Sequence, residues 1–574
     1  MKKKYVRWTL WTIASPFILF IILCILIYLP PIQNFLVDKA AVYASEATGM
    51  NISVGRISLS FPLNLVVTNV DAASLHNDTL LSVRRLQVNV QLLPLLKKQV
   101  EVDGISLQGA TVNSNDLIHG MKLNGTLGEL FISSHGVALD PETAIVNKVL
   151  LKDTDLSLCL NDTAAADTAA SDTTYWKIIL QDIDLQNVSF ALDMPLDSLS
   201  LAASLDNAIL RDGLIDLHKS AYSLQTFRIE NGRVRYDNGK PLAADSLSSG
   251  LDPSHIALTD IGVKLDSLYY GGRNMKAIIS QFVLKERSGV EIVSATGRMV
   301  SNDKVLRVPS LKLETRDSYL ELNAAMDWNA LDFKGEGLMS ARLMADIGKP
   351  DVVRFMGRMD EKFVRQYPSE PLRIRTGIDG DLNKLKLTTL TAELPGALGL
   401  FARGELTHLT DSLLRGGDIT LEAETKDLKF VSTLAEGIEI PYGTRLEGKF
   451  TMAGAKMGTD LLLMQPEAQA VAAADTIPIT VYNDSISVAD DFKMERAARL
   501  FAKYDLSRDR YEADLAVNHF DLHQFMPADS LYTLSTRLKV EGEGFDFFSP
   551  RTYFNAEGGI DRFHYGSYHL TGIS

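Results

Sequence analysis

The chain has 574 residues, of which 46% are hydrophobic, and a formal net charge of -14. An acidic chain is repelled by polyphosphate, which argues against nucleic acid as a partner and against broad contact with anionic lipid headgroups. The only cysteines are Cys24, inside an apolar N-terminal run, and Cys159, so the two cannot pair. The composition therefore excludes a small secreted fold held by disulfide bonds. The length fits either several domains or one extended array of repeats.

The N-terminus carries a basic cluster followed by an apolar run from Trp8 to Leu29. Roughly 22 residues at 1.5 Å each reach about 33 Å, enough to cross a bilayer core of about 30 Å. A cleaved signal peptide is the alternative, but its apolar part is usually shorter and ends in small residues. We expect an uncleaved anchor over residues 1–30, with the basic cluster in the cytoplasm and the rest exported. The anchor residues are Trp8, Phe17, Phe20, Leu23 and Leu29.

Residues 31–50 are expected to form an amphipathic juxtamembrane helix that ends at Gly49. The region that follows, residues 51–340, contains a ten-residue pattern that recurs four times. Its copies begin at Ile105, Val149, Ile183 and Phe227. In each copy, apolar and polar residues alternate, which indicates a strand with one apolar face.

A Gly, Asp or Asn stands at the fifth position of each copy, and beyond it the apolar phase slips by one residue. These residues are Gly109, Asp153, Asn187 and Asn231. A one-residue slip would turn the apolar face to water, so the chain needs a bulge or tight bend there. Repetition of this kind predicts a mostly β protein built as an elongated, curved, taco-like sheet.

The apolar side chains of these strands are the candidate lining of an open groove. They are Leu86, Val88, Val90, Ile105, Leu107, Val112, Leu156, Leu158, Leu185, Phe190, Leu192, Ile229 and Val234. The alternative is the sealed core of a β-sandwich, which the same alternation would produce. The sequence shows no second set of elements to cover the apolar face, which favours the open groove.

Residues 341–574 contain a longer repeat, in which a short helix precedes a strand pair punctuated by glycine. The helices are expected to begin at Asp351, Asp427 and Asp521, where each carboxylate would cap the helix N-terminus. Such helices could clip the edge of a sheet at intervals. No capping segment follows the last unit, so we expect the chain to be truncated at its C-terminus, Ser574.

The sequence carries no motif for catalysis, cofactor binding or metal binding. His519 and His523 have the i, i+4 spacing of metal ligands on a helix, but two surface histidines around a helix cap explain them as well. Cys159 fits a small apolar strand residue better than a nucleophile. We therefore expect a protein that is not an enzyme.

Several segments carry a resemblance to a known family. They are residues 31–37, 47–57, 65–70, 82–86, 102–107, 501–506 and 511–522. On these, the chain resembles the AsmA-like superfamily of bacterial envelope proteins, in its TamB-like branch, as an N-terminal portion. The resemblance implies a Gram-negative inner-membrane protein with a long periplasmic groove. It further implies phospholipid movement toward the outer membrane and work with an outer-membrane barrel protein resembling TamA.

Three functional hypotheses follow. The first is a hydrophobic conduit whose partners are phospholipid acyl chains and the inner membrane. The second is a scaffold whose sheet edge helps to translocate and assemble outer-membrane β-barrels. The third is a structural envelope protein with a sealed core.

Overall fold

The computed structural model describes most of the chain after residue 50. The described ranges are 50–60, 64–74, 79–91, 102–114, 120–138, 142–161, 175–239, 250–331, 337–357, 359–434, 437–466, 480–482, 485–487, 494–545, 549 and 552–573, with positions 39, 41, 42 and 45. The expected anchor over residues 1–30 and most of the juxtamembrane segment lie outside them. In these ranges, no helix has the length and apolar character needed to span a membrane.

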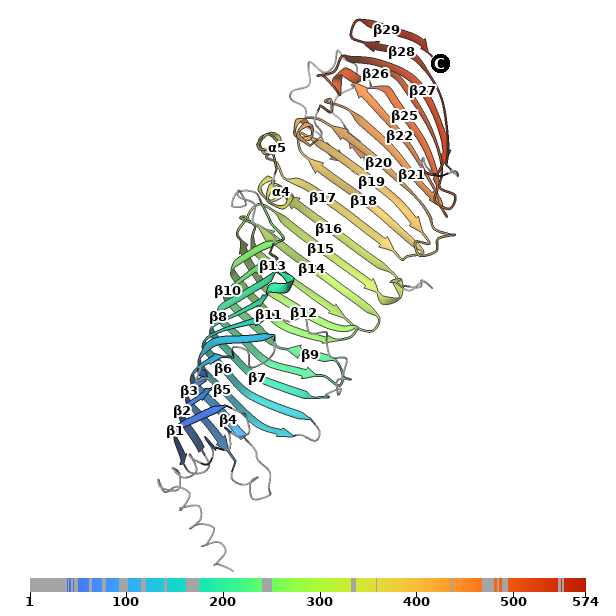
Figure 1. The fold of residues 1–574 in the computed structure, drawn as a ribbon. Coiled ribbons are helices and arrows are strands. Elements are labelled where there is room, and N and C mark those ends of the chain that lie inside the picture. The colour runs from blue at the N-terminus through green and yellow to red at the C-terminus, as the bar shows by residue number, and fades with distance from the viewer. Residues whose placement is uncertain are drawn as a thin grey trace, which may run out of the picture. The chain divides into compact units, whose positions relative to one another are not determined.

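The described chain is mostly β and divides into two units, each built of strands that lie side by side (Figure 1). Unit 1 comprises residues 1–244 and 252–287, and unit 2 comprises residues 245–251 and 288–574. Residue 340, the expected boundary between two repeat regions, lies within a strand of unit 2.

Unit 1 contains twelve strands. They are β1 (Asn51–Ser60), β2 (Asn64–Ala73), β3 (Thr79–Val90), β4 (Val102–Asn113), β5 (Met121–Ala138), β6 (Thr143–Leu160), β7 (Lys177–Met194), β8 (Leu199–Asp216), β9 (Ala221–Leu224), β10 (Thr226–Asp237), β11 (His255–Gly271) and β12 (Asn274–Glu286). Neighbouring strands pair antiparallel except β6 and β7, which are parallel. β9 and β10 both lie between β8 and β11, and together they make one strand interrupted at Gln225.

The fifth position of the repeat is left-handed in all four copies. The φ angles are 63° at Gly109, 50° at Asp153, 51° at Asn187 and 54° at Asn231. Asn69 and Asp260 adopt the same conformation, at 53° and 51°. Gly, Asn and Asp are the residues that enter this region at least cost, which explains the composition of the position. The expected tight bend is confirmed.

The bend is shared in register by neighbouring strands. Between β3 and β4, for example, the pairs run from Val83 with Ala110 to Arg85 with Gln108 without a shift, and so Arg84 stands opposite Gly109. Because both strands contain the extra residue at the same height, the hydrogen-bonded ladder continues through the bend. The exceptions are the pairings of β10 with β11 and of β11 with β12, where the register shifts at the bend. Most of the slips are therefore coordinated bends rather than bulges of one strand against another.

Exposure along each strand shows what the bend achieves. In β1, Ile52 and Val54 are half-buried, Gly55 and Arg56 are both exposed, and Ile57 is half-buried again. In β6, Lys152 and Asp153 are likewise consecutive exposed residues. Two consecutive outward residues restore the apolar side chains to the same face beyond the bend. We call the outward positions at the bend the polar ridge. Its directly paired members are Arg56, Thr68, Arg85, Gln108, Glu129, Lys152, Gln186, Asn207 and Glu230.

Unit 2 contains fifteen strands in its main ladder, within the described residues. They are β13 (Glu291–Ser301), β14 (Val305–Thr315), β15 (Tyr319–Asp327), β16 (Met339–Ile347), β17 (Leu372–Gly380), β18 (Lys384–Leu394), β19 (Leu398–Thr407), β20 (Gly416–Thr425), β21 (Arg445–Ala453), β22 (Lys456–Pro466), β25 (Met494–Asp505), β26 (Arg510–Asp521), β27 (Leu531–Glu543), β28 (Tyr553–Tyr565) and β29 (Tyr568–Ile573). Each pairs antiparallel with the next. A separate hairpin joins β23 (Thr480–Tyr482) and β24 (Ser485–Ser487).

Short helices connect some of these strands. They are α4 (Lys349–Met356) and α5 (Glu361–Gln366), which Figure 1 shows at the same end of β16 and β17, and the 3-10 helices η2 (Trp328–Leu331), η3 (Lys429–Thr433) and η5 (Leu522–Gln524); unit 1 has η1 (Pro195–Asp197). Helical turns thus occur at all three predicted places.

The predicted caps are correct at two of these turns and wrong at the third. The Asp521 carboxylate accepts the backbone N–H of His523, and that of Asp427 accepts the N–H of Lys429. Helix α4 instead begins at Lys349, and Asp351 inside it is 1% exposed. Its carboxylate accepts hydrogen bonds from Thr315, Ser318 and Arg354, and so ties α4 to the β14–β15 turn rather than capping the helix.

The main hydrophobic cluster of unit 2 forms between α5 and η3. Phe363 packs edge-on against Phe430, at 5.7 Å between ring centroids, and Tyr367 lies 5.1 Å from Phe430. Leu394, Ala397 and Leu428 complete the buried group. Phe355 of α4 is 58% exposed, and the buried residue of this helix is Asp351. The α-helix that packs in this cluster is therefore α5, which the sequence pattern did not predict.

We expect Asn69→Val to lower the free energy of local opening of β2 by about 1 to 2 kcal/mol, because a β-branched residue is strained at a φ of 53°. Asn69→Gly should change it little. Hydrogen exchange of the β2 and β3 amides measures the effect. Thr68→Val, one residue away in an ordinary strand conformation, is the control. Equal protection in Asn69→Val and Asn69→Gly would contradict the role assigned to the bend.

Candidate functional site

The apolar face of unit 1 is the largest feature that the strand register creates. Directly paired residues of neighbouring strands point to the same side, so the pairings define rows of side chains across the sheet. The first apolar row is Ile57, Val67, Leu86, Leu107, Leu130, Leu151, Leu185, Ala208, Ile229, Val263 and Phe282. At about 4.8 Å per strand, this row extends roughly 48 Å. The length exceeds the apolar thickness of one bilayer, about 30 Å.

A second apolar row runs parallel to the first on the other side of the bend. It consists of Ile52, Ala72, Leu81, Val112, Gly125, Leu156, Phe190, Ala203, Val234 and Leu258. The two rows share a face only because the bend corrects the phase of every strand. Without it, the second row would lie on the same side as the polar ridge.

Twelve of the thirteen predicted lining residues fall in these rows or in the next rows outward. Val88 pairs with Ile105, and Leu158 pairs with Leu192. Val90 is the last residue of β3 and pairs with Val102, beyond a shift in register between Asn89 and Val90. Twelve of the thirteen are half-buried, and Phe190 is 39% exposed. The structure thus brings the predicted residues together on a surface that neighbouring strands cover only in part.

The prediction missed the members of the rows on β1, β2, β5, β8, β11 and β12. β5 shows why: Leu123, Leu127 and Leu130 keep the apolar pattern, but the slip lies at Gly128. Because Leu127 and Glu129 flank the glycine, the sequence of β5 resembles an ordinary alternating strand with one residue out of place. Pairing it with its neighbour β6, whose pattern is clear, would have found it.

Unit 2 also has an apolar face, with smaller side chains. One row is Leu320, Ala345, Ile374, Ala392, Leu400, Ala423, Leu446, Leu463, Ala498 and Val517. Leu372, Leu394 and Leu398 are two residues from members of this row and so lie on the same face. They contact the cluster around Phe363. The α5–η3 cluster therefore covers one end of this apolar face and leaves Phe450, on the same face, 42% exposed.

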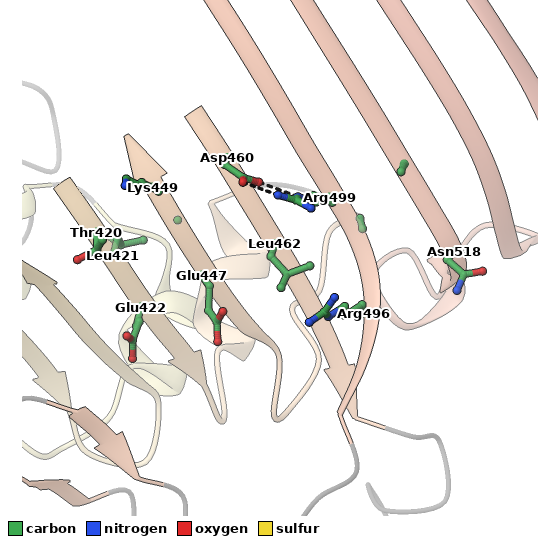
Figure 2. A pocket seen from close by; sticks show the side chains of 13 residues that line it. Thr420, Leu421, Glu422, Glu447, Lys449, Asp460, Leu462, Arg496, Arg499 and Asn518 are labelled. Atoms are coloured by element: carbon green, nitrogen blue, oxygen red, sulfur yellow. Dashed lines mark hydrogen bonds and ion pairs between the residues drawn. The ribbon is translucent and has the colours of Figure 1, made fainter. Parts of the chain in front are cut away.

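The opposite face of the later strands is polar. A hollow of about 520 Å³ lies on this face, lined by three carboxylates and three basic groups. Figure 2 shows the side chains that line it. Arg499 donates two hydrogen bonds to Asp460, at 2.9 and 2.6 Å, and these bonds hold the pKa of the Asp460 carboxyl below its ordinary value. Arg445 lies 3.8 Å from Glu422 and 3.6 Å from Glu447. Charges of both signs in equal number do not select one kind of ionic ligand.

The two histidines with helical spacing do not share a helix. His519 lies in β26 with a φ of 47°, and its Nδ1 is 2.8 Å from the Asn518 amide oxygen. His523 lies in η5, where its Nδ1 is 3.2 Å from the carbonyl oxygen of Asp529. No group of three metal-ligating side chains is found in the part of the chain that the structure describes. Cys159 lies half-buried in β6.

No family model and no curated protein matches the chain. The resemblance to AsmA-like proteins therefore stays a prediction.

We expect Phe190→Ala to lower the free energy of unfolding by about 1 kcal/mol, because a ring that is 39% exposed loses little buried area. Phe363→Ala should cost about 3 to 5 kcal/mol, because Phe363 is 1% exposed and its removal leaves a cavity. Urea unfolding followed by circular dichroism measures both. A similar large cost at both positions would mean that the apolar face of unit 1 is sealed.

Proposed function

We propose that the protein binds phospholipid acyl chains on the apolar face of unit 1. In this function it is an inner-membrane, single-pass protein whose periplasmic sheet conducts phospholipid toward the outer membrane of a Gram-negative cell. The observation that carries the proposal is the pair of continuous apolar rows, most of whose members are only half-buried.

Acyl chains need a path that keeps them out of water. Each buried methylene contributes about 0.8 kcal/mol, so two chains of 16 carbons gain roughly 25 kcal/mol when fully transferred. A carrier surface must therefore be apolar without interruption, and the two rows of unit 1 meet this requirement over ten or more strands. The bend keeps the apolar side chains of both halves of each strand on one face, and we propose that this face is the lining of a groove.

The membrane attachment rests on the sequence. The basic cluster and the apolar run from Trp8 to Leu29 predict an anchor with a cytoplasmic N-terminus. Such an anchor would hold β1, which begins at Asn51, near the membrane surface. Lipid leaving the bilayer would then meet the first strands of the apolar rows.

A sealed structural core is the less favoured alternative. Residues of a sealed core are mostly buried, whereas in the rows of unit 1 only Ala72 and Ala208 are buried and most of the other members are half-buried. A scaffold for β-barrel assembly is the other alternative, in which a strand edge of the sheet would pair with a strand from another chain.

Photocrosslinking tests acyl-chain binding directly. A crosslinking amino acid at Leu107, Leu158 or Phe190 should capture phospholipid in cells, because these positions lie in the apolar rows. The matched positions Gln108 and Ser157 are immediate neighbours on the other face and should capture much less. Mass spectrometry of the adducts identifies the lipid. Equal capture by both sets would refute the assignment of the apolar face.

Charge insertion separates a conduit from a sealed core. Val88→Asp or Leu185→Arg places an unpaired charge on the apolar face. In an open groove, water reaches the charge, so the protein should accumulate normally while the outer membrane becomes leaky. In a sealed core, the same changes should deplete the protein. Protein abundance and outer-membrane permeability are measured together, and Gln108→Asp is the control on the other face.

A further inference from the structure

Charge is separated along the polar ridge of unit 1. The ridge positions of β1 to β4 include three cations, Arg56, Arg84 and Arg85, and no anion. From β5 onward, the ridge carries carboxylates in excess, with one lysine. These carboxylates are Glu129, Asp153, Asp206 and Glu230. The ridge therefore has a basic end on the first strands and an acidic end on the later ones.

The three arginines are close together and exposed. Arg56 and Arg85 both pair with Thr68 of the strand between them, which places their backbones about 10 Å apart. Arg84 stands opposite Gly109, and its guanidinium lies 2.9 to 3.1 Å from the position that a Cβ on that glycine would occupy. The absence of a side chain at Gly109 thus lets Arg84 lie across the neighbouring strand.

These guanidinium groups have no carboxylate partner among the described residues. Arg85 donates to the Gln87 amide oxygen at 3.3 Å. The nearest acid on this face of β2, Asp71, accepts the hydroxyl of Ser82 at 2.6 Å instead. Many cations elsewhere in the sheet do have carboxylate partners, such as Arg211 with Asp184 and Lys285 with Asp260. The basic end of the ridge is therefore available to an external anion.

We infer that Arg56, Arg84 and Arg85 form a docking surface for anionic phospholipid headgroups at a bilayer surface. Guanidinium groups bind phosphate through paired, charge-assisted hydrogen bonds. The chain as a whole carries a charge of -14, so an anionic bilayer repels most of its surface and attracts this end. The first strands would then face the bilayer, and the acidic strands would point away. This inference concerns the polar side of unit 1, not its apolar face.

Fluorescence quenching in nanodiscs tests the docking. The full chain, with Cys24 and Cys159 replaced by serine, is labelled at Ser53→Cys, an exposed position on β1. The nanodiscs contain a lipid with a nitroxide on its headgroup. Quenching should be strong with phosphatidylglycerol, weak with phosphatidylcholine alone, and should fall as salt rises. The triple variant Arg56→Gln, Arg84→Gln, Arg85→Gln should reduce the docking equilibrium about a hundredfold, at roughly fivefold per residue.

The control variant loses the same charge on later strands of unit 1, through Lys152→Gln, Arg233→Gln and Arg235→Gln. It should dock as the unsubstituted chain does, and both variants should keep its melting temperature. Three results would overturn the inference. They are equal quenching in the two lipids, an equal loss of docking in the control variant, and a larger relief of quenching by inorganic phosphate than by chloride at the same ionic strength. Acyl capture at Leu107 is measured in parallel. Retained capture with lost docking would leave the proposed function intact.

Discussion

The left-handed residue at the bend of β2, β4, β6, β7, β10 and β11 is the constraint on which unit 1 depends. A β-strand turns alternate side chains to opposite faces, so a single extra residue in one strand would break the ladder and invert its pattern. Here the neighbouring strand has the extra residue at the same height, and in most strand pairs the hydrogen bonds continue. Asn69, Gly109, Asp153 and Asn187 each supply the backbone geometry at their own strand. The apolar rows and the polar ridge are two consequences of the same bend.

The two units bury their side chains differently. Among the described residues of unit 1, the apolar rows are covered by the strands beside them, so stability is spread over many half-buried contacts and over the ladder hydrogen bonds. Unit 2 adds a compact cluster in which Phe363 and Phe430 are buried between α5 and η3. Unit 2 also contains the buried carboxylate of Asp351, which accepts hydrogen bonds from the Ser318 hydroxyl and the Arg354 guanidinium. These helical segments pack at one end of the strands.

The distribution of charge gives each face a distinct chemistry. On the polar side of unit 2, acids and bases alternate and pair, as Asp460 does with Arg499, and little net charge remains. On the ridge of unit 1, the arginines of the first strands are separated from the carboxylates of the later ones. A chain that avoids anionic surfaces as a whole can therefore still present one cationic end. Acyl chains would then bind to the apolar face, and headgroups would bind to the polar ridge.

Much of this architecture could be predicted from the sequence, because alternation is a local property. The mostly β class, the bend at Gly109, Asp153, Asn187 and Asn231, and the thirteen apolar positions all follow from residues that lie within ten of each other. The pairing of strands does not. The parallel alignment of β6 with β7, the split strand β9–β10 and the membership of β5 in the rows depend on partners distant in the chain.

Tertiary structure also decided which of several similar residues is buried. Asp351 was expected to cap a helix, but its carboxylate is buried beside the hydroxyl donors Thr315 and Ser318 instead. The alignment of Arg56, Arg84 and Arg85 likewise appears only when β1, β2 and β3 are placed in register. The sequence by itself determined which face of each strand is apolar, since side-chain periodicity is set by the backbone. Only the tertiary structure decided which strands stand next to each other, because that choice is made by contacts between residues far apart in the chain.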